Sequence, residues 1–188
     1  MPSQQGAPPA AARGRVLVLG GVRSGKSRFA ESLLPAGEPA TYVATGYPPD
    51  GADPEWAERV AGHRARRPAH WHTRETLEVA AALRDATGTV LVDCLALWLT
   101  RVLDSVGAWT EAPGWEAALR ARTGDLVDAW TGATSTVIAV SNEVGWGVVP
   151  DTRAGRVFRD GLGVLNTALA ASADAVWLLV AGIPNRLR

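Results

Sequence analysis

Residues 20–27 combine three glycines with a lysine and a serine, residue types that together bind phosphate groups. They match the spacing G-x-x-x-x-G-K-S/T and lie between an apolar run at residues 16–19 and a segment of helical character. The glycines allow backbone N–H groups to converge on phosphate oxygens, and the start of a helix adds positive potential. We expect Lys26 to reach the β- and γ-phosphates of a nucleoside triphosphate and the Ser27 hydroxyl to bind Mg²⁺. The expected phosphate loop consists of Gly20, Gly21, Val22, Arg23, Ser24, Gly25, Lys26 and Ser27.

Lys26 is the only lysine among the 19 basic residues of the chain, and all the others are arginines. The planar guanidinium group of arginine cannot replace the compact ammonium group of lysine in a phosphate cavity, which is a reason for this position to keep lysine. The same scarcity excludes the N-K-x-D motif of guanine-specific switch proteins, because that motif needs a second lysine. The alternative is a chance match in a chain with 20 glycines, with Lys26 simply solvated.

Asp93 ends an apolar run at residues 89–92, where a parallel strand would bring its carboxylate to the edge of a sheet. An acid at this place in phosphate-loop proteins holds Mg²⁺, directly or through water. We therefore interpret Asp93 as a metal-linked carboxylate. The alternative is that Asp93 caps the helix expected to follow it.

His63 lies in an arginine-rich segment, residues 59–67. On a helix, Arg59, His63 and either Arg66 or Arg67 share one face. Cations beside an imidazole disfavour its protonated form, so His63 would stay neutral and available as a nucleophile. Taken alone, the pattern favours the simpler alternative, a basic solvated helix with an incidental histidine.

His70 and His72 flank Trp71 and would point the same way if this short segment is extended. Two histidines at this spacing can bind a metal, but no third ligand accompanies them in the sequence. We favour ordinary surface or packing roles for both.

Apolar runs alternate with helical segments along the chain, which indicates an α/β fold. Continuous apolar runs typical of strands in a buried parallel sheet lie at residues 16–19, 41–44, 89–92, 136–140 and 175–180. Helices are expected over residues 26–34, 54–66, 75–86, 95–106, 114–130 and 152–172, with a short extended piece at 70–72. We predict a mostly parallel sheet flanked by helices, of the RecA-like phosphate-loop NTPase type, with ligand sites beyond the C-terminal ends of the strands.

The length of 188 residues corresponds to about one domain. We expect residues 1–13 to be a disordered lead-in and residues 14–188 to form a single nucleotide-binding catalytic domain. The formal net charge of +0 argues against a nucleic-acid partner, and no apolar run is long enough for a membrane span or a signal peptide. A single cysteine, Cys94, excludes an internal disulfide framework and a Cys-based zinc cluster. We expect a cytoplasmic protein.

Three segments together carry a resemblance to a known family. The phosphate loop continues as R-F-A-E to Glu31, residues 59–68 contain His63 and its arginines, and residues 141–150 read S-N-E-V-G-W-G-V-V-P. In combination they closely resemble the bifunctional adenosylcobinamide kinase/adenosylcobinamide-phosphate guanylyltransferase family of cobalamin biosynthesis. The phosphate loop alone is common to many proteins, whereas N-E-V-G-x-G-x-V-P is specific to this family. The resemblance covers nearly everything from residue 15 to residue 183.

The resemblance implies two reactions. The first phosphorylates the aminopropanol hydroxyl of adenosylcobinamide with ATP or GTP. The second transfers GMP from GTP to that phosphate through a guanylylated histidine, which gives adenosylcobinamide-GDP and pyrophosphate. The resemblance also implies a homo-oligomer, a trimer in the family, although no residue pattern in this chain fixes the number of subunits.

The nucleophile of the family lies in the pattern R-I-x-x-H-R/K, which residues 59–64 match, so the resemblance makes His63 the nucleophile, with Lys26 as the second catalytic residue. The other positions that resemble nucleotide-contacting residues of the family are Thr45, Gly46, Arg64, Ala65, Arg66, Arg67, Glu75 and Asp93. Gly62 stands where some members have a second histidine, which removes an alternative nucleophile. Asp93 stands where other members have glutamate, which shortens its reach toward metal or ribose.

Two other functions fit the phosphate loop. One is a kinase of another small alcohol that performs no guanylyl transfer. The other is a non-catalytic or motor-type module that changes shape on nucleotide hydrolysis. A covalent GMP adduct would exclude the first, and phosphorylation of adenosylcobinamide would exclude the second.

Overall fold

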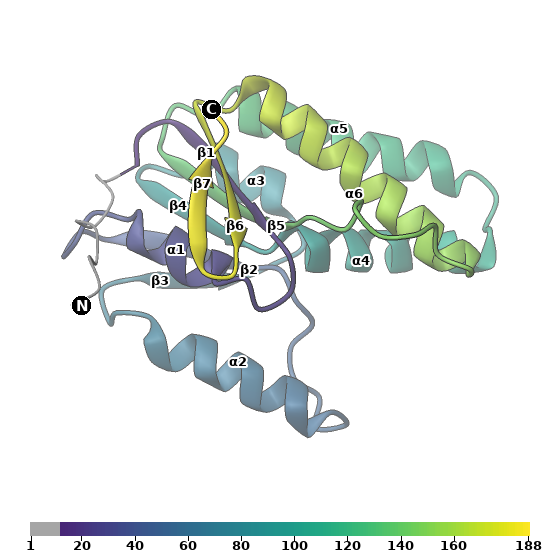
Figure 1. The fold of residues 1–188 in the computed structure, drawn as a ribbon, viewed down its shortest axis with the longest axis horizontal. Helices are drawn as coiled ribbons and strands as arrows, with labels where there is room; N and C mark the ends of the chain where they lie inside the picture. The colour runs from purple at the N-terminus through teal and green to yellow at the C-terminus, as the bar shows by residue number, and fades with distance from the viewer. Residues whose placement is uncertain (1–11) are drawn as a thin grey trace.

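The computed structural model describes residues 12–188 (Figure 1), so most of the lead-in predicted at residues 1–13 lies outside the described residues. Seven strands form one sheet in the order β3-β2-β4-β5-β1-β6-β7. The strands are β1 (Arg15–Gly20), β2 (Ala40–Ala44), β3 (His72–Glu75), β4 (Thr89–Asp93), β5 (Val137–Asn142), β6 (Ala175–Val180) and β7 (Ile183–Arg186). All pairings are parallel except that of β6 with β7, which confirms the predicted mostly parallel α/β fold.

Helices cover both faces of the sheet. They are α1 (Lys26–Ser32), α2 (Pro54–Arg66), α3 (Val79–Arg84), α4 (Leu95–Ser105), α5 (Trp115–Thr131) and α6 (Arg153–Ser172), with a short 3-10 turn at Ala108–Thr110. The chain runs from β1 through β2 to β3 in one direction across the sheet and then returns through β4 and β5 to β6. Because parallel crossovers are right-handed, α1 and α2 lie on one face and α3 to α6 on the other (Figure 1).

Apolar burial is concentrated in the central strands and in the helices behind them. Residues 137–141 of β5 are all buried, and α4 buries most of its length against the sheet. Each fully buried tryptophan has a hydrogen-bond acceptor for its indole N–H: Trp98 donates to the Leu77 carbonyl at 2.9 Å and Trp130 to the Leu169 carbonyl at 3.2 Å. Among residues 12–188, none of the helices combines the length and the apolar character of a membrane span.

Helix α2 differs from the others because none of its residues is buried. Its start is specified locally: the Asp53 side chain accepts a hydrogen bond from the Trp56 N–H at 3.0 Å, and Pro54 occupies the first helical position, where an N–H would have no partner. Trp56 also fastens α2 to the strand-end loop, because its indole N–H donates to the Tyr47 carbonyl at 3.0 Å. Figure 1 shows α2 standing apart from the other helices.

The extended segment predicted at residues 70–72 was placed to begin two residues too early. The Trp71 N–H donates to the Pro68 carbonyl at 3.0 Å, so His70 lies in a turn, and β3 begins only at His72. The two histidines therefore do not share an extended segment.

The helix predicted over residues 75–86 is also wrong in its start. Glu75 is the last residue of β3, where it pairs with Ala44 of β2, and α3 begins only at Val79. Parallel pairing with β2 outweighs the local helical pattern of this segment.

Strand β5 is longer than the predicted run at 136–140. Ser141 and Asn142 continue it because they pair with Leu19 and Gly20 at the end of β1. The strand pairing thus carries two polar residues to the edge of the sheet, directly beside the phosphate loop.

Strand β7 was not expected from the sequence. It returns antiparallel to β6 after a tight turn in which Ala181 and Gly182 have φ angles of 50° and 81°. Two consecutive left-handed residues are typical of the turns that join antiparallel strands. In the sequence this turn is marked only by Gly182, with Pro184 two residues later, which is a weak signal.

The shallow attachment of α2 leads to a prediction about local stability. We expect its backbone amides to exchange with solvent at least about tenfold faster than those of α4, a helix of similar length, because little apolar burial opposes the opening of α2. Hydrogen exchange followed by mass spectrometry on peptides from the two helices measures this. Equal protection of α2 and α4 would contradict it.

Candidate active site

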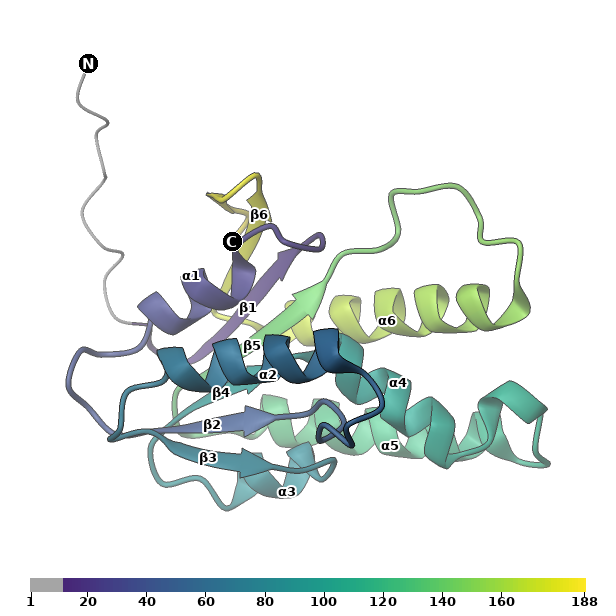
Figure 2. The ribbon, with the colours of Figure 1, turned by 90° about the horizontal axis from the view of Figure 1, so that it is seen from below.

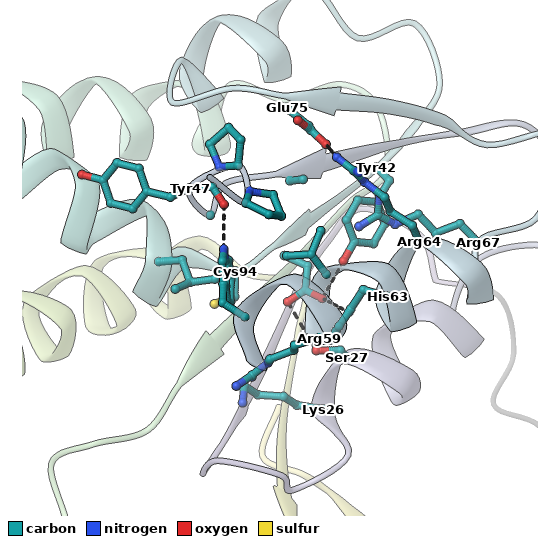
Figure 3. Close-up of a pocket in the computed structure, with 18 of the residues that line it drawn as sticks. Lys26, Ser27, Tyr42, Tyr47, Arg59, His63, Arg64, Arg67, Glu75 and Cys94 are labelled. Carbon is teal, nitrogen blue, oxygen red and sulfur yellow. Dashed lines mark hydrogen bonds and ion pairs between the residues drawn. The ribbon is translucent and has the colours of Figure 1, made fainter. Parts of the chain in front are cut away.

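A pocket opens at the C-terminal edge of the sheet, between the start of α1 and one face of α2 (Figure 3). The ends of β2, β3 and β4 contribute Ala44, Glu75 and Asp93 to its wall. The empty space within it, including space open to solvent, is about 700 Å³. The position is the one expected for a ligand site in an open parallel sheet.

The phosphate loop borders this pocket and is tightly packed from behind. A Cβ atom at Gly20 would lie 2.5 Å from the Ser24 hydroxyl oxygen, so only glycine fits there. Gly25 has a φ of 88°, a left-handed conformation that glycine adopts without strain. The turn between β6 and β7 supports the loop, because the Gly182 N–H donates to the Ser24 carbonyl at 3.0 Å.

Lys26 is buried at the point where the loop enters α1. Its Nζ donates to the Gly21 carbonyl at 3.1 Å. Burial lowers the pKa of the Lys26 ammonium, because the charged form loses hydration, while the nearby Asp93 favours the charged form. An ammonium group has three N–H donors, so donors remain for an anion in the pocket.

Asp93 is the residue on which the side chains of the pocket converge. Its Oδ1 accepts from the Ser27 hydroxyl at 3.3 Å, and its Oδ2 accepts from the Tyr42 hydroxyl at 2.7 Å. His63 Nδ1 lies 3.8 Å from the same Oδ2. Burial and the adjacent Asp93 both raise the pKa of Tyr42. The phenol therefore stays protonated and donates a hydrogen bond to Asp93. No side-chain hydrogen bond caps α4, so the Asp93 carboxylate faces the pocket instead of the helix.

His63 projects from α2 into the pocket (Figure 3). Its Nδ1 lies 3.1 Å from Arg66 Nη2, and an arginine can only donate, so Nδ1 accepts in this contact. Burial lowers the pKa of His63, and the guanidinium groups of Arg66, Arg59 and Arg67 lower it further, against the opposing effect of Asp93. On balance these surroundings favour the neutral imidazole, with Nδ1 accepting from Arg66.

The arginines at the end of α2 tie it to the rest of the protein. Arg64 forms an ion pair with Glu75, and Arg66 lies 3.6 Å from Glu31 on α1. The Arg67 guanidinium stacks 3.6 Å from the centre of the Tyr42 ring. These contacts hold the His63 face of α2 over the pocket.

Eight of the 17 residues that the sequence predicted for the site line this pocket. Those that line the pocket are Lys26, Ser27, Gly46, His63, Arg64, Arg67, Glu75 and Asp93. Gly46 has a packing role as well, because a Cβ there would lie 2.9 Å from the Trp56 ring.

Other predicted residues are placed differently. Thr45 is fully buried, and its hydroxyl donates to the Cys94 carbonyl at 2.7 Å. Ala65 is exposed, and Arg66 turns toward His63 and Glu31. Residues 20–25 precede Lys26 and do not line this pocket.

Several lining residues were missed from the sequence. Tyr42 is the clearest, because a phenol inside an otherwise apolar strand was a signal for a buried hydrogen bond. Nothing in the sequence marks Trp56 as a pocket residue, because the chain has eight tryptophans and no pattern sets this one apart. Cys94 also lines the pocket, where burial raises the pKa of its thiol to about 11, so it stays protonated and unreactive.

His70 and His72 lie at the other end of the strands, away from this pocket. They border a shallow hollow with Thr41 and Asp85. Within residues 12–188, no three His, Cys, Asp or Glu side chains gather as a metal site would require.

A family model described as cobinamide kinase / cobinamide phosphate guanyltransferase matches residues 16–187. The bifunctional adenosylcobalamin biosynthesis protein CobU of Salmonella typhimurium is 38% identical over 184 residues, which cover 92% of this chain and 99% of that protein. The corresponding CobU of Escherichia coli is 37% identical, with 92% and 99% covered. The bifunctional adenosylcobalamin biosynthesis protein CobP of Pseudomonas aeruginosa is 43% identical, with 93% and 97% covered.

Among solved structures, a prototypical ATPase from the type III secretion system of pathogenic bacteria superimposes with a TM-score of 0.55 at 11% identity. The match covers 89% of this chain and 51% of the ATPase chain, so the two share a fold over about half of the larger protein. The phosphate-loop architecture is common to both, whereas the sequence match over nearly the whole length is specific. The chain therefore belongs to the cobinamide kinase / cobinamide phosphate guanyltransferase family.

Proposed function

We propose that the protein carries out two successive transfers to one acceptor. It phosphorylates the aminopropanol hydroxyl of adenosylcobinamide with ATP or GTP, and it then transfers GMP from GTP to the new phosphate, which gives adenosylcobinamide-GDP. Membership of the family supports both reactions. The observation that carries the assignment of residues is that Lys26, His63 and Asp93 line one pocket.

Phosphate binding rests on Lys26 and on the backbone of the loop before it. Mg²⁺ would be held by Ser27 and Asp93, whose nearest oxygens lie 3.3 Å apart and are of the hard type that this ion prefers. When bound, the ion offsets negative charge on the phosphates. Tyr42 supports this arrangement by holding the second oxygen of Asp93.

The kinase reaction needs no covalent enzyme intermediate. The hydroxyl oxygen of the acceptor attacks the γ-phosphorus, its proton is released, and the bond from that phosphorus to the leaving ADP or GDP breaks. Lys26 stabilises the charge that develops on the phosphate oxygens. His63 takes no part in this step.

The guanylyl transfer uses His63 as the nucleophile. Its imidazole nitrogen attacks the α-phosphorus of GTP, a P–N bond forms, and pyrophosphate leaves. A phosphate oxygen of the acceptor then attacks the same phosphorus, and the P–N bond breaks to return the imidazole. Arg59 and Arg67 line the pocket with His63 and offset charge on the phosphates.

We also propose that the protein acts as a homo-oligomer, a trimer, in the cytoplasm. The resemblance to the family supports the homo-oligomer. Sedimentation equilibrium would measure the number of subunits.

The neutral state of His63 can be tested directly by NMR titration. We expect its pKa to lie below the ordinary value of 6.5. Arg66→Met should raise this pKa, because removal of a nearby cation favours the imidazolium. Asp93→Asn should lower it, because removal of a nearby anion disfavours the imidazolium. A shift of the same sign in both variants would show that these charges do not control the titration.

The nucleophile is tested by covalent labelling. Incubation with GTP should label the parent protein with GMP through an acid-labile, alkali-stable bond. His63→Ala should abolish labelling and guanylyl transfer while largely sparing phosphorylation of adenosylcobinamide. His70→Ala and His72→Ala are matched controls, which should label normally because both residues lie outside the pocket. If the parent never labels, the protein is a kinase only.

Both reactions should depend on Lys26, because one phosphate loop serves both. Lys26→Ala should slow phosphorylation and guanylyl transfer together, each by well over the tenfold that about 1.4 kcal/mol represents. Separate rate measurements with adenosylcobinamide and with its phosphate would check this. Normal guanylyl transfer in the variant would mean that GTP has a second site.

A further inference from the structure

The loop between β5 and α6 takes no part in the pocket described above. Asn142, the last residue of β5, lines that pocket, but residues 143–152 do not. This loop nevertheless contains the most distinctive stretch of the sequence, E-V-G-W-G-V-V-P.

The first end of the loop is held against the phosphate loop. The Glu143 N–H donates to the Gly20 carbonyl at 3.2 Å, and the Glu143 carboxylate accepts from the Gly145 N–H at 2.9 Å. The buried Asn166 side chain of α6 donates to the Asn142 carbonyl at 3.0 Å. The loop therefore leaves the sheet from a defined position beside Gly20.

The second end is held by α6. Arg156 Nη1 donates to the carbonyls of Pro150 and Asp151 at 2.9 Å and 2.8 Å. A Cβ atom at Gly155 would lie 2.8 Å from the Pro150 ring, so this glycine lets the loop approach the helix. Side-chain hydrogen bonds thus hold both ends of the loop.

Between these ends the loop presents large apolar side chains to solvent. Trp146, Val148 and Val149 are 75%, 95% and 61% exposed, and Val22 at the tip of the phosphate loop is 72% exposed. Figure 2 shows the loop arching away from the body of the protein before it reaches α6. Three large apolar side chains exposed within four consecutive residues indicate a surface that binds a ligand or partner.

The location restricts what can bind there. The pocket extends from Lys26 toward α2 and the ends of β2, β3 and β4, and the nucleotide would fill it. An acceptor hydroxyl must reach the γ-phosphate from outside this volume. The β5–α6 loop starts beside Gly20, next to the phosphate loop, and so lies on an approach that the pocket leaves open.

We infer that residues 146–149, together with Val22, form the docking surface for the corrinoid ring of the acceptor. This inference rests on the proposed function, which identifies the acceptor as a corrinoid. A corrin is a large macrocycle whose faces carry methyl groups, and the indole of Trp146 offers a flat apolar surface of the matching kind. Docking there leaves the aminopropanol arm to reach past Gly20 to the phosphates at Lys26.

The test uses Trp146→Ala and Val148→Ser in the full chain. Both side chains are exposed, so neither change should disturb the fold. We expect equilibrium dialysis to show at least tenfold weaker binding of cobinamide, with the KM for adenosylcobinamide raised by a similar factor. GTP-dependent labelling of His63 should keep the parental rate, because it requires no acceptor.

Leu187→Ser is the matched control. Leu187 is 60% exposed, but its N–H donates to the Val176 carbonyl near the start of β6, at the opposite end of the strands from the phosphate loop. This variant should bind cobinamide as the parent does.

Three results would overturn the inference. Parental cobinamide affinity in both loop variants would exclude the surface. Unchanged affinity with a smaller sedimenting species would assign the surface to a second copy of the chain. Loss of GMP labelling together with cobinamide binding would mean that the substitutions act through the phosphate loop. Failure of the proposed function is distinguishable, because it would appear as a parent that binds cobinamide without phosphorylating it.

Discussion

The Asp93 carboxylate is the point through which three separate parts of the protein are connected. It accepts a hydrogen bond from Ser27 at the start of α1 and another from Tyr42 on β2, and it lies 3.8 Å from His63 on α2. A carboxylate at a half-buried sheet edge needs such partners, because its charge is costly where water is scarce. The pairing of β4 with β2 fixes the position of Asp93, so the surrounding elements must place Ser27, Tyr42 and His63 near it.

Charge also explains how α2 is held. The helix buries no residue. The contacts that hold it and its C-terminal end include the Trp56 hydrogen bond, the Arg64–Glu75 and Arg66–Glu31 pairs and the stacking of Arg67 on Tyr42. Exposed ion pairs contribute little stability individually, so α2 is attached less firmly than the helices of the other face. Such a weakly attached helix can change the distance from His63, the proposed nucleophile, to a phosphate without disturbing the sheet.

Much of the fold follows from local patterns in the sequence. The runs at residues 16–19 and 89–92 are apolar without alternation, which is physically reasonable only for strands covered on both faces, and both are strands of the parallel sheet. The segments that were predicted wrongly are decided by pairing with distant strands. Glu75 is extended because β2 lies beside it, and β7 exists because β6 offers it a free edge. A window of a few residues does not contain those partners.

The candidate site divides in the same way. Its chemically active residue types and the spacing of the phosphate loop are properties of the sequence, which suffices to single out Lys26, His63 and Asp93. Their common pocket, the hydrogen bond from Tyr42 and the approach of Arg66 to Glu31 depend on residues far apart in the chain. The sequence alone determined which reactive groups the protein contains, because it fixes the type of each side chain. Only the tertiary structure decided which groups meet, because the distances between them depend on how the strands are ordered in the sheet.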